Sequence, residues 1–211
     1  MEELSPRARA KRRQITDAAR ALFLSQGFAR TSMDAITAEA GVSKQTLYAY
    51  FPSKAELLLA ILDEAQQSLA TPADGRAPTS RAELRQALLS FSHRLIDTML
   101  RDEVLAVLRL ALGEAVHVPE VRPTFLQALP LALLGRARAI LEAAAGNGVV
   151  VLDHPDVSVR MLVGPLMSYV VFGGLMATGV AERPADEAVE WLVDAYLRTL
   201  DFTDADFGDA S

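Results

Sequence analysis

The chain has no cysteine and only three histidines among its 211 residues, and aromatic residues make up only 6% of it. Without cysteine, disulfides and thiolate metal sites are excluded. The histidines are His93, His117 and His154, and none has a neighbour at the spacing of a paired metal-binding motif. Nucleophile elbows, phosphate-binding loops and dinucleotide fingerprints are also missing, so we do not expect an enzyme of those classes.

Glu114 and His117 are one turn apart on a predicted helix and could together ligate a metal ion. A surface pair, or polar groups of a ligand pocket, is the favoured interpretation of these two residues. We therefore predict neither a metal nor another cofactor.

Charged residues are missing from the 21 positions of Met161–Ala181. As one helix this run would be about 31 Å long, which is enough to span a membrane. Its four glycines and Pro165 moderate its hydrophobicity, and a helix buried in an oligomer is equally apolar on all sides. Because the first residues, MEELSPRARAKRRQ, also lack the apolar core of a secretory signal, we expect a cytoplasmic protein.

Apolar residues make up 51% of the chain and predict a substantial core. Charge, in contrast, is distributed unevenly along the sequence. The net charge is −6, which alone argues against a nucleic-acid partner. Nine Lys/Arg and three Asp/Glu nevertheless give Arg7–Lys54 a net charge of +6. A basic head on an acidic body indicates that only the head meets a polyanion.

The basic head contains signals for several helices. Apolar residues recur at helical spacing over Arg7–Gln26, and Gly27 follows where a C-cap is expected. Thr31 or Ser32 can cap a second, short helix that ends at Gly41.

A third helix can be capped by Ser43 and would bury Leu47 and Phe51. Ser53 and Glu56 then form a capping box for a fourth helix. Two short helices joined by a tight glycine turn predict a helix-turn-helix, a motif that binds DNA.

The third helix also has a polar side, which a purely structural helix would not need. Its outward positions, at helical spacing, are Lys44, Gln45, Tyr48 and Ala49. Lysine can donate to guanine, glutamine can pair with adenine, and alanine can touch a thymine methyl group. Hydroxyl groups nearby can donate to phosphate, and they belong to Ser43, Thr46, Tyr48 and Tyr50. The alternative is a small helical hairpin that merely exposes tyrosines.

The stretch TSMDAITAEAGVSKQTLYAYFPSKAELL resembles the DNA-binding domain of tetracycline-repressor-like (TetR/AcrR) bacterial regulators. The resemblance implies an all-α homodimer with a helix-turn-helix domain over residues 1–52 and a larger helical domain, for ligand binding and dimerisation, over residues 53–200. It also implies a set of operator contacts and a basic arm for the minor groove. With the residues named above, the predicted DNA-binding set is Arg12, Arg13, Thr31, Ser32, Ser43, Lys44, Gln45, Thr46, Tyr48, Ala49, Tyr50 and Lys54.

Beyond a turn-rich loop at Thr71–Thr79, the remainder is predicted to be helical. The first expected helix starts at the Ser80 capping box, and two more cover roughly Asp102–Val116 and Glu120–Ala145. The uncharged run is expected to be a further helix, and the last one starts near Pro184. Val149–Leu152 could be extended, but we expect no partner strand for it. The acidic residues 201–211 are expected to be a disordered tail.

The apolar C-terminal helices predict a ligand cavity and a dimer interface, although ordinary core packing remains the alternative for any single residue. The candidate ligand-binding residues are Leu58, Leu62, Gln66, Phe91, Met99, His117, Phe125, Tyr169 and Phe172. The candidate dimerisation residues, several of them small enough for close helix packing, are Gly173, Gly174, Ala177, Leu192, Ala195 and Tyr196.

The sequence therefore predicts a homodimeric repressor that a hydrophobic or amphipathic small molecule releases from a palindromic operator. The helix from Ser53 would connect the two domains and transmit the ligand's effect. Two alternatives stay open: an activator or DNA binder without an effector, and a helical enzyme with a vestigial DNA-binding head.

Overall fold

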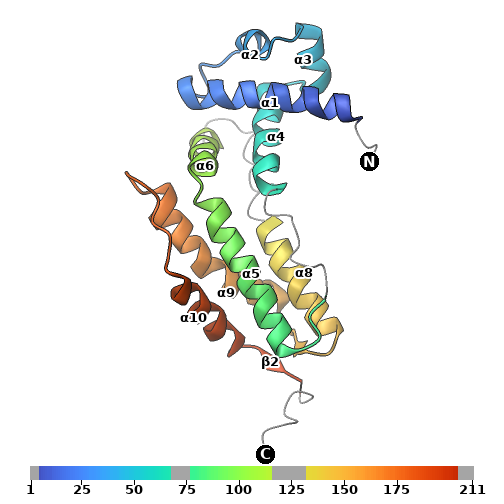
Figure 1. The fold of residues 1–211 in the computed structure, drawn as a ribbon, viewed down its shortest axis with the longest axis vertical. Helices are drawn as coiled ribbons and strands as arrows, with labels where there is room; N and C mark the ends of the chain where they lie inside the picture. Colours follow the sequence, from blue (N-terminus) through green and yellow to red (C-terminus); the bar gives the residue numbers. More distant parts are fainter. Residues whose placement is uncertain (1–4, 68–76, 116–131, 204–211) are drawn as a thin grey trace, which may run out of the picture. The chain divides into compact units, whose positions relative to one another are not determined.

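The computed structural model describes residues 5–67, 77–115 and 132–203, and its regular secondary structure in these ranges is helical except for two short strands (Figure 1). This confirms the all-α fold class. The chain divides into two compact units, one made of residues 1–66 and 106–129 and the other of residues 67–105 and 130–211. The first unit therefore includes α4 and part of α6, which the sequence analysis had assigned to the second domain.

The first unit contains the predicted helix-turn-helix. Its helices are α1 (Pro6–Gln26), α2 (Met33–Glu39), α3 (Lys44–Tyr50), α4 (Lys54–Gln67) and the part of α6 (Asp102–Ala115) from residue 106 onward. The Ser32 hydroxyl accepts from the Ala35 amide at the start of α2, and the Ser43 hydroxyl accepts from the Thr46 amide at the start of α3. These bonds satisfy amides that have no partner within the helix, which is why each helix begins there.

Two glycines allow the chain to turn between these helices. Gly27 ends α1 with φ +87°, and Gly41 lies between α2 and α3 with φ +59°. Side chains disfavour this left-handed region, so glycine suits both places. The predictions for Gly27 as a C-cap and for Gly41 as the turn residue are confirmed.

Buried apolar side chains hold α1, α2 and α3 together. Ile36 of α2 and Leu47 of α3 are completely buried, as the spacing of the motif predicts. Phe23 of α1 packs on Phe28, with 5.1 Å between the ring centroids. Phe51 is also buried and ends α3 with its amide donating to the Leu47 carbonyl. The motif is therefore fixed from its apolar side, which leaves its polar side exposed.

The second unit is a helical bundle organised around α5 (Arg81–Met99). This helix contacts α8 (Ala132–Gly146), α9 (Pro155–Val170) and α10 (Asp186–Leu197), as Figure 1 shows. The predicted capping box starts α5, because the Ser80 hydroxyl accepts from the Glu83 amide. Arg85 of α5 forms two hydrogen bonds to the Asp194 carboxylate of α10, at 2.6 and 2.9 Å.

The uncharged run Met161–Ala181 is not one helix, contrary to our expectation. α9 starts earlier, at Pro155, and continues into a π-helical turn, η2 (Val171–Leu175), where the helix ends. A Cβ at Gly173 would lie 2.7 Å from the Glu182 carbonyl oxygen, so the returning chain passes too close for a side chain there. The helix predicted from Pro184 starts instead at Asp186.

Two strands of two residues each form where no strand partner was expected. β1 (Val150–Val151) pairs antiparallel with β2 (Asp201–Phe202), so that Val150 lies opposite Phe202. The amide of Thr203 continues the contact by donating to the Val149 carbonyl. The predicted tail therefore begins as a strand, and its residues 204–211 lie outside the described part of the chain.

One helix of the described residues, Pro155–Leu175, is long and apolar enough to cross a membrane by length and composition. A core or interface helix of a water-soluble protein meets the same criteria. This feature alone therefore does not indicate a membrane protein.

Tyr196 links α10 to α9 inside the second unit. Its ring is buried, its hydroxyl lies 2.7 Å from the Ser158 hydroxyl, and burial raises its pKa. An ionised tyrosine is disfavoured in the folded chain, so this residue stabilises the fold below its unfolded-state pKa of about 10 and loses that contribution as pH rises further.

We expect Tyr196→Phe to lower the free energy of unfolding by about 1 kcal/mol at neutral pH, because it removes one hydrogen bond. The deficit should shrink above about pH 10, where only the wild-type chain has this tyrosine to ionise on unfolding. Urea unfolding of both proteins at neutral pH and above about pH 10 measures the difference in free energy of unfolding. Tyr48→Phe, which changes an exposed ring, is the control. A deficit that grows with pH would contradict the assignment.

Candidate nucleic-acid interface

The outward side of α3 carries the side chains predicted to read bases. Lys44, Gln45, Tyr48 and Ala49 are exposed, whereas Leu47 between them is completely buried. Thr46 and Tyr50 are half-buried at the edges of this surface. The structure thus places these predicted contacts on one side of one helix, where they can enter a major groove together.

Lys44 already has a partner of opposite charge within the chain. Its amine lies 2.8 Å from the Asp34 carboxylate of α2, and this hydrogen bond raises the pKa of Lys44. Both side chains are well exposed, so the pair contributes little to stability. DNA phosphate or a guanine edge can therefore replace Asp34 at low cost.

Ser32 and Ser43 begin α2 and α3 and are both exposed. Each hydroxyl accepts a bond from its helix, while a serine hydroxyl also has one proton to donate. The Ser43 hydroxyl is 2.7 Å from that of Thr46, and either can be the donor. These two helix starts suit phosphate oxygens, which accept from hydroxyls and from helix N-termini.

Two other predicted contacts are directed inward. Thr31 is only 2% exposed, and its hydroxyl donates to the Gly27 carbonyl at 2.8 Å. A direct contact between the Thr31 side chain and DNA does not fit this geometry, because the hydroxyl braces the turn before α2. The Lys54 amine, at the start of α4, is bonded to carbonyl oxygens of the same turn.

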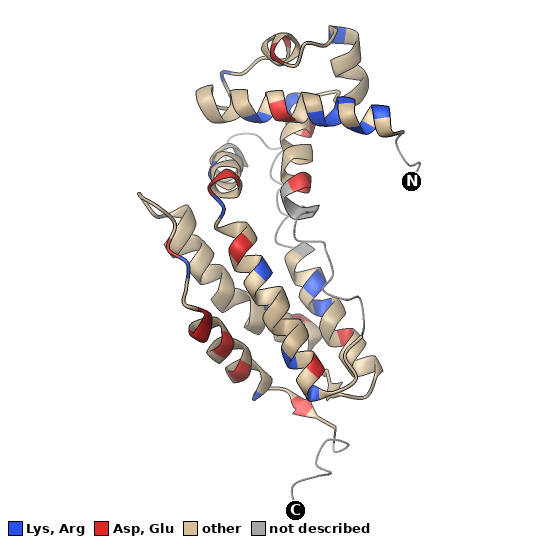
Figure 2. Cartoon of the chain, in the orientation of Figure 1, with Lys and Arg blue, Asp and Glu red and all other residues tan. Residues whose placement is uncertain are grey.

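The predicted basic arm is the N-terminal part of α1, along which Lys and Arg gather in Figure 2. Arg13 is exposed, with Asp17 3.9 Å away. Arg12 places its guanidinium 4.7 Å from the centre of the Phe51 ring, a cation–π contact to the end of α3. Acidic side chains gather instead on α10 (Figure 2), which agrees with the charge asymmetry of the sequence.

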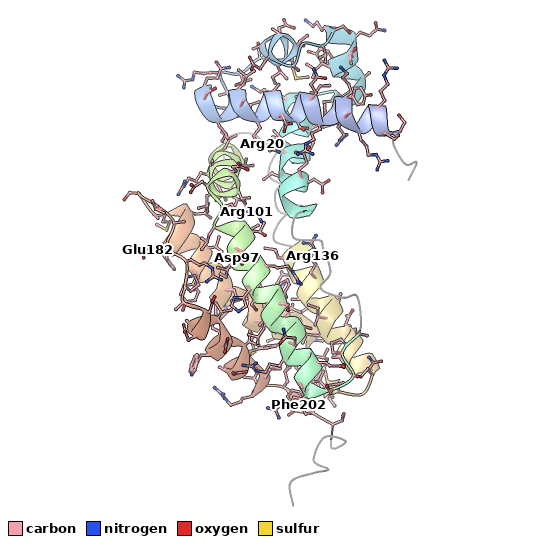
Figure 3. All side chains as sticks on the ribbon, in the orientation of Figure 1. Arg20, Asp97, Arg101, Arg136, Glu182 and Phe202 are labelled. Atoms are coloured by element: carbon pink, nitrogen blue, oxygen red, sulfur yellow. The ribbon has the colours of Figure 1, made fainter. Side chains whose placement is uncertain are left out.

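A polar cluster inside the first unit was missed by the sequence analysis. The Glu64 carboxylate of α4 accepts from the Thr16 hydroxyl at 2.8 Å and from Arg20 at 2.6 Å, both on α1. Figure 3 labels Arg20 on the side of α1 toward α4. Residues so far apart in the chain give no local signal, although a buried threonine at a core-facing helix position could have suggested a polar partner.

The candidate ligand-binding residues are distributed over both units. Leu58 and Leu62 are buried in the first unit, and Phe91 and Met99 are buried in the second. Tyr169 and Phe172 line an open surface groove of about 400 Å³ together with Gly173 and residues 182–184. His117 and Phe125 lie outside the described residues, as does the side chain of Gln66.

The candidate dimerisation residues fall into two groups. Ala177, Leu192 and Ala195 are half-exposed and remain available to a partner surface. Gly174 is buried, and a Cβ there would lie 2.7 Å from Leu100 and 2.9 Å from Leu105.

Gly174 and the ring of Tyr196 are thus buried within the second unit itself, and half-buried Gly173 lies against the Glu182 carbonyl oxygen of the same unit. The prediction that these three residues face a second copy does not fit the structure. The sequence analysis missed other apolar side chains on this region that are exposed, namely Val157, Met161, Met176, Val180 and Trp191.

Within the described ranges, no group of three or more acidic or histidine side chains is arranged to hold a metal ion. His117 of the possible Glu114–His117 pair lies outside those ranges, and the side chain of Glu114 is not described.

Two family sequence patterns match the chain. Residues 15–61 match the bacterial regulatory proteins of the tetR family, and residues 86–200 match the C-terminal domain of AefR-like transcriptional repressors. A solved structure named "Flavonoid-responsive Regulator FrrA" is similar along almost the whole chain. It is 32% identical, covers 92% of this chain and 98% of its own, and has a TM-score of 0.71.

Curated relatives match over shorter stretches. The transcriptional activator FasR of Mycolicibacterium smegmatis is 37% identical over 38% of this chain, and the transcriptional repressor KstR of Rhodococcus jostii is 35% identical over 49%. The match spans 38% of FasR and 48% of KstR, so the chain covers less than half the length of these relatives. A helix-turn-helix with an exposed reading side, together with matches over both units, shows that the chain belongs to the TetR family of DNA-binding transcriptional regulators.

Proposed function

We propose that the chain acts as a homodimeric repressor that binds a palindromic operator through α3 of each subunit. The observation that carries this proposal is the set of exposed side chains on one side of α3, in a helix whose Leu47 is completely buried; they are Ser43, Lys44, Gln45, Tyr48 and Ala49. The match of residues 86–200 to the C-terminal domain of AefR-like repressors favours repression. FasR is named an activator, so activation is the second candidate. If the chain is an activator, deleting its gene should lower the expression of the genes that it regulates.

Dimerisation is supported by the apolar surface of α9 and α10. Trp191 of α10 is 66% exposed, and Phe172 of η2 is 71% exposed. Val157 and Met161 are also exposed, and they lie on α9, which continues into η2. Several large apolar side chains exposed on contacting helices are typical of an interaction surface. A second copy would bury them by symmetry and would place two α3 helices on successive half-sites.

A small-molecule effector is supported by the apolar composition of the second unit. The name of FrrA says that it responds to flavonoids, and this structure is similar over almost the whole chain. We propose a hydrophobic or amphipathic effector and would test planar aromatic compounds first. Such a compound must bind the state that does not bind DNA more tightly, since equal affinity for both states shifts nothing.

A helical enzyme with an idle DNA-binding head is the remaining alternative. Turnover assays with cell extracts would reveal it, whereas a regulator would show only binding.

We expect Gln45→Ala to relax base preference at one position of each half-site and to cost about 1–3 kcal/mol there, because a glutamine amide pairs with adenine. Binding-site selection followed by titration of the selected duplexes measures it. Arg13→Ala is the control and should weaken binding to every sequence by a similar factor. Equal weakening on all sequences by Gln45→Ala would show that Gln45 does not read a base.

We expect Trp191→Glu to raise the dimer dissociation constant at least about a hundredfold, since it removes a large apolar ring from the interface and introduces a charge. Sedimentation measures the oligomeric state. Because Trp191 is the only tryptophan, its emission in the wild-type chain should also shift to longer wavelength as the dimer dissociates on dilution. Leu24→Glu, on an exposed leucine of α1, is the matched control and should leave the dimer intact. A Trp191→Glu variant that sediments as a dimer would place the interface elsewhere.

We expect at least one planar aromatic compound to weaken operator binding by tenfold or more while leaving binding to random DNA unchanged. The measurement is operator affinity at increasing compound concentration, with a sugar and a nucleotide as controls. If compounds of all three classes leave the affinity unchanged, the chain is a regulator without an effector of this kind.

A further inference from the structure

Lys54 is the first residue of α4, where its charge is unfavourable with respect to the helix itself. The N-terminal end of a helix carries partial positive charge, so a lysine in the first turn needs compensation from elsewhere. The structure supplies that compensation from the chain between α1 and α2. The Lys54 amine donates to the carbonyl oxygens of Phe28 at 2.6 Å, Ala29 at 3.3 Å and Thr31 at 2.8 Å. Three acceptors match the three protons of an ammonium group.

The ring of Phe28 supports the same amine from another side. The amine lies 4.4 Å from the ring centroid, within the range of a cation–π interaction. Phe28 is itself buried against Phe23 of α1, so the ring is a fixed support. The amine is therefore held by groups whose own positions are set by the core.

The turn that Lys54 holds determines where α2 begins. Thr31 accepts from Lys54 through its carbonyl and is followed directly by Ser32, the cap of α2. α2 in turn contacts α3, and Ile36 of α2 and Leu47 of α3 are completely buried. A continuous series of bonds and contacts thus runs from the start of α4 to the reading helix.

We propose that Lys54 is a positioning residue, which sets the orientation of α2 and α3 for specific DNA recognition by binding the carbonyls of the 28–31 turn. This inference rests on the proposed DNA-binding function. It replaces the expectation that Lys54 contacts a phosphate. To reach a phosphate, the amine would have to break its hydrogen bonds to three carbonyl oxygens.

The two roles differ in what they do to specific and non-specific binding. A lost phosphate contact weakens binding to all DNA and makes its salt dependence shallower by about one unit per contact. A misplaced α3 weakens only the binding that depends on base contacts. A variant that was merely unstable would lower the active fraction and weaken both kinds of binding equally.

The test uses Lys54→Met, which keeps most of the side-chain volume and removes the charge. We expect affinity for the selected operator to fall at least tenfold, while affinity for a random duplex of equal length stays within twofold and its salt dependence keeps its slope. Arg13→Met is the control and should weaken both duplexes and reduce the slope. Equal weakening of both duplexes with a shallower slope for Lys54→Met would overturn the proposal.

Lys54→Arg provides a second test in a variant that keeps the charge. A planar guanidinium cannot direct three protons to three converging carbonyls, so we expect it to lose most of the specific affinity. A phosphate contact would instead tolerate arginine well, and wild-type affinity of this variant would refute the positioning role.

A third measurement does not depend on DNA. The amides of Thr31, Ala35 and Ile36 are hydrogen-bonded in the turn and at the start of α2. Their hydrogen exchange should become at least tenfold faster in Lys54→Met, with exchange in α5 unchanged. Unchanged exchange at these three amides would overturn the proposal even if operator binding fell. If the wild-type chain selected no DNA sequence at all, the proposed function would fail, and the exchange measurement would still decide whether Lys54 orders the turn.

Discussion

The burial of the apolar sides of α2 and α3, including Ile36 and Leu47, is the constraint on which the rest of the DNA-binding surface depends. These two side chains are completely buried and join helices too short to be stable alone. Because the apolar side of α3 is fixed in this way, the helix has only one side left for Gln45 and Tyr48. The proposed reading of a base by Gln45 requires such rigidity, since a glutamine that moves cannot discriminate between base edges.

Local signals predicted the first unit well and the ends of the later helices poorly. Caps such as Ser43 and the turn at Gly41 act within a few residues, so the sequence around them contains all that is needed. The end of α9 depends instead on Glu182 passing over Gly173, and β1 depends on a strand far along the chain. Hydropathy of the uncharged run indicated burial but could not reveal where the helix stops.

The candidate site shows the same division. Residue type and helical spacing were enough to place Lys44, Gln45 and Tyr48 on the exposed side of α3. They could not show that the side chains of Thr31 and Lys54 turn inward, because that depends on carbonyl groups brought together only in the folded turn. A lysine next to a recognition helix invites a phosphate contact, yet backbone oxygens compete for the same charge.

The short pairing of β1 with β2 affects how the second unit can unfold. It joins the residues just after α8 to those just after α10, so the chain between them forms a closed loop containing α9 and α10. While these strands stay paired, neither helix has a free end from which to fray, since both ends of the loop are joined by the same pair of strands. The two helices should therefore open together as one cooperative unit, and a single sub-global opening would expose the whole α9–α10 surface at once.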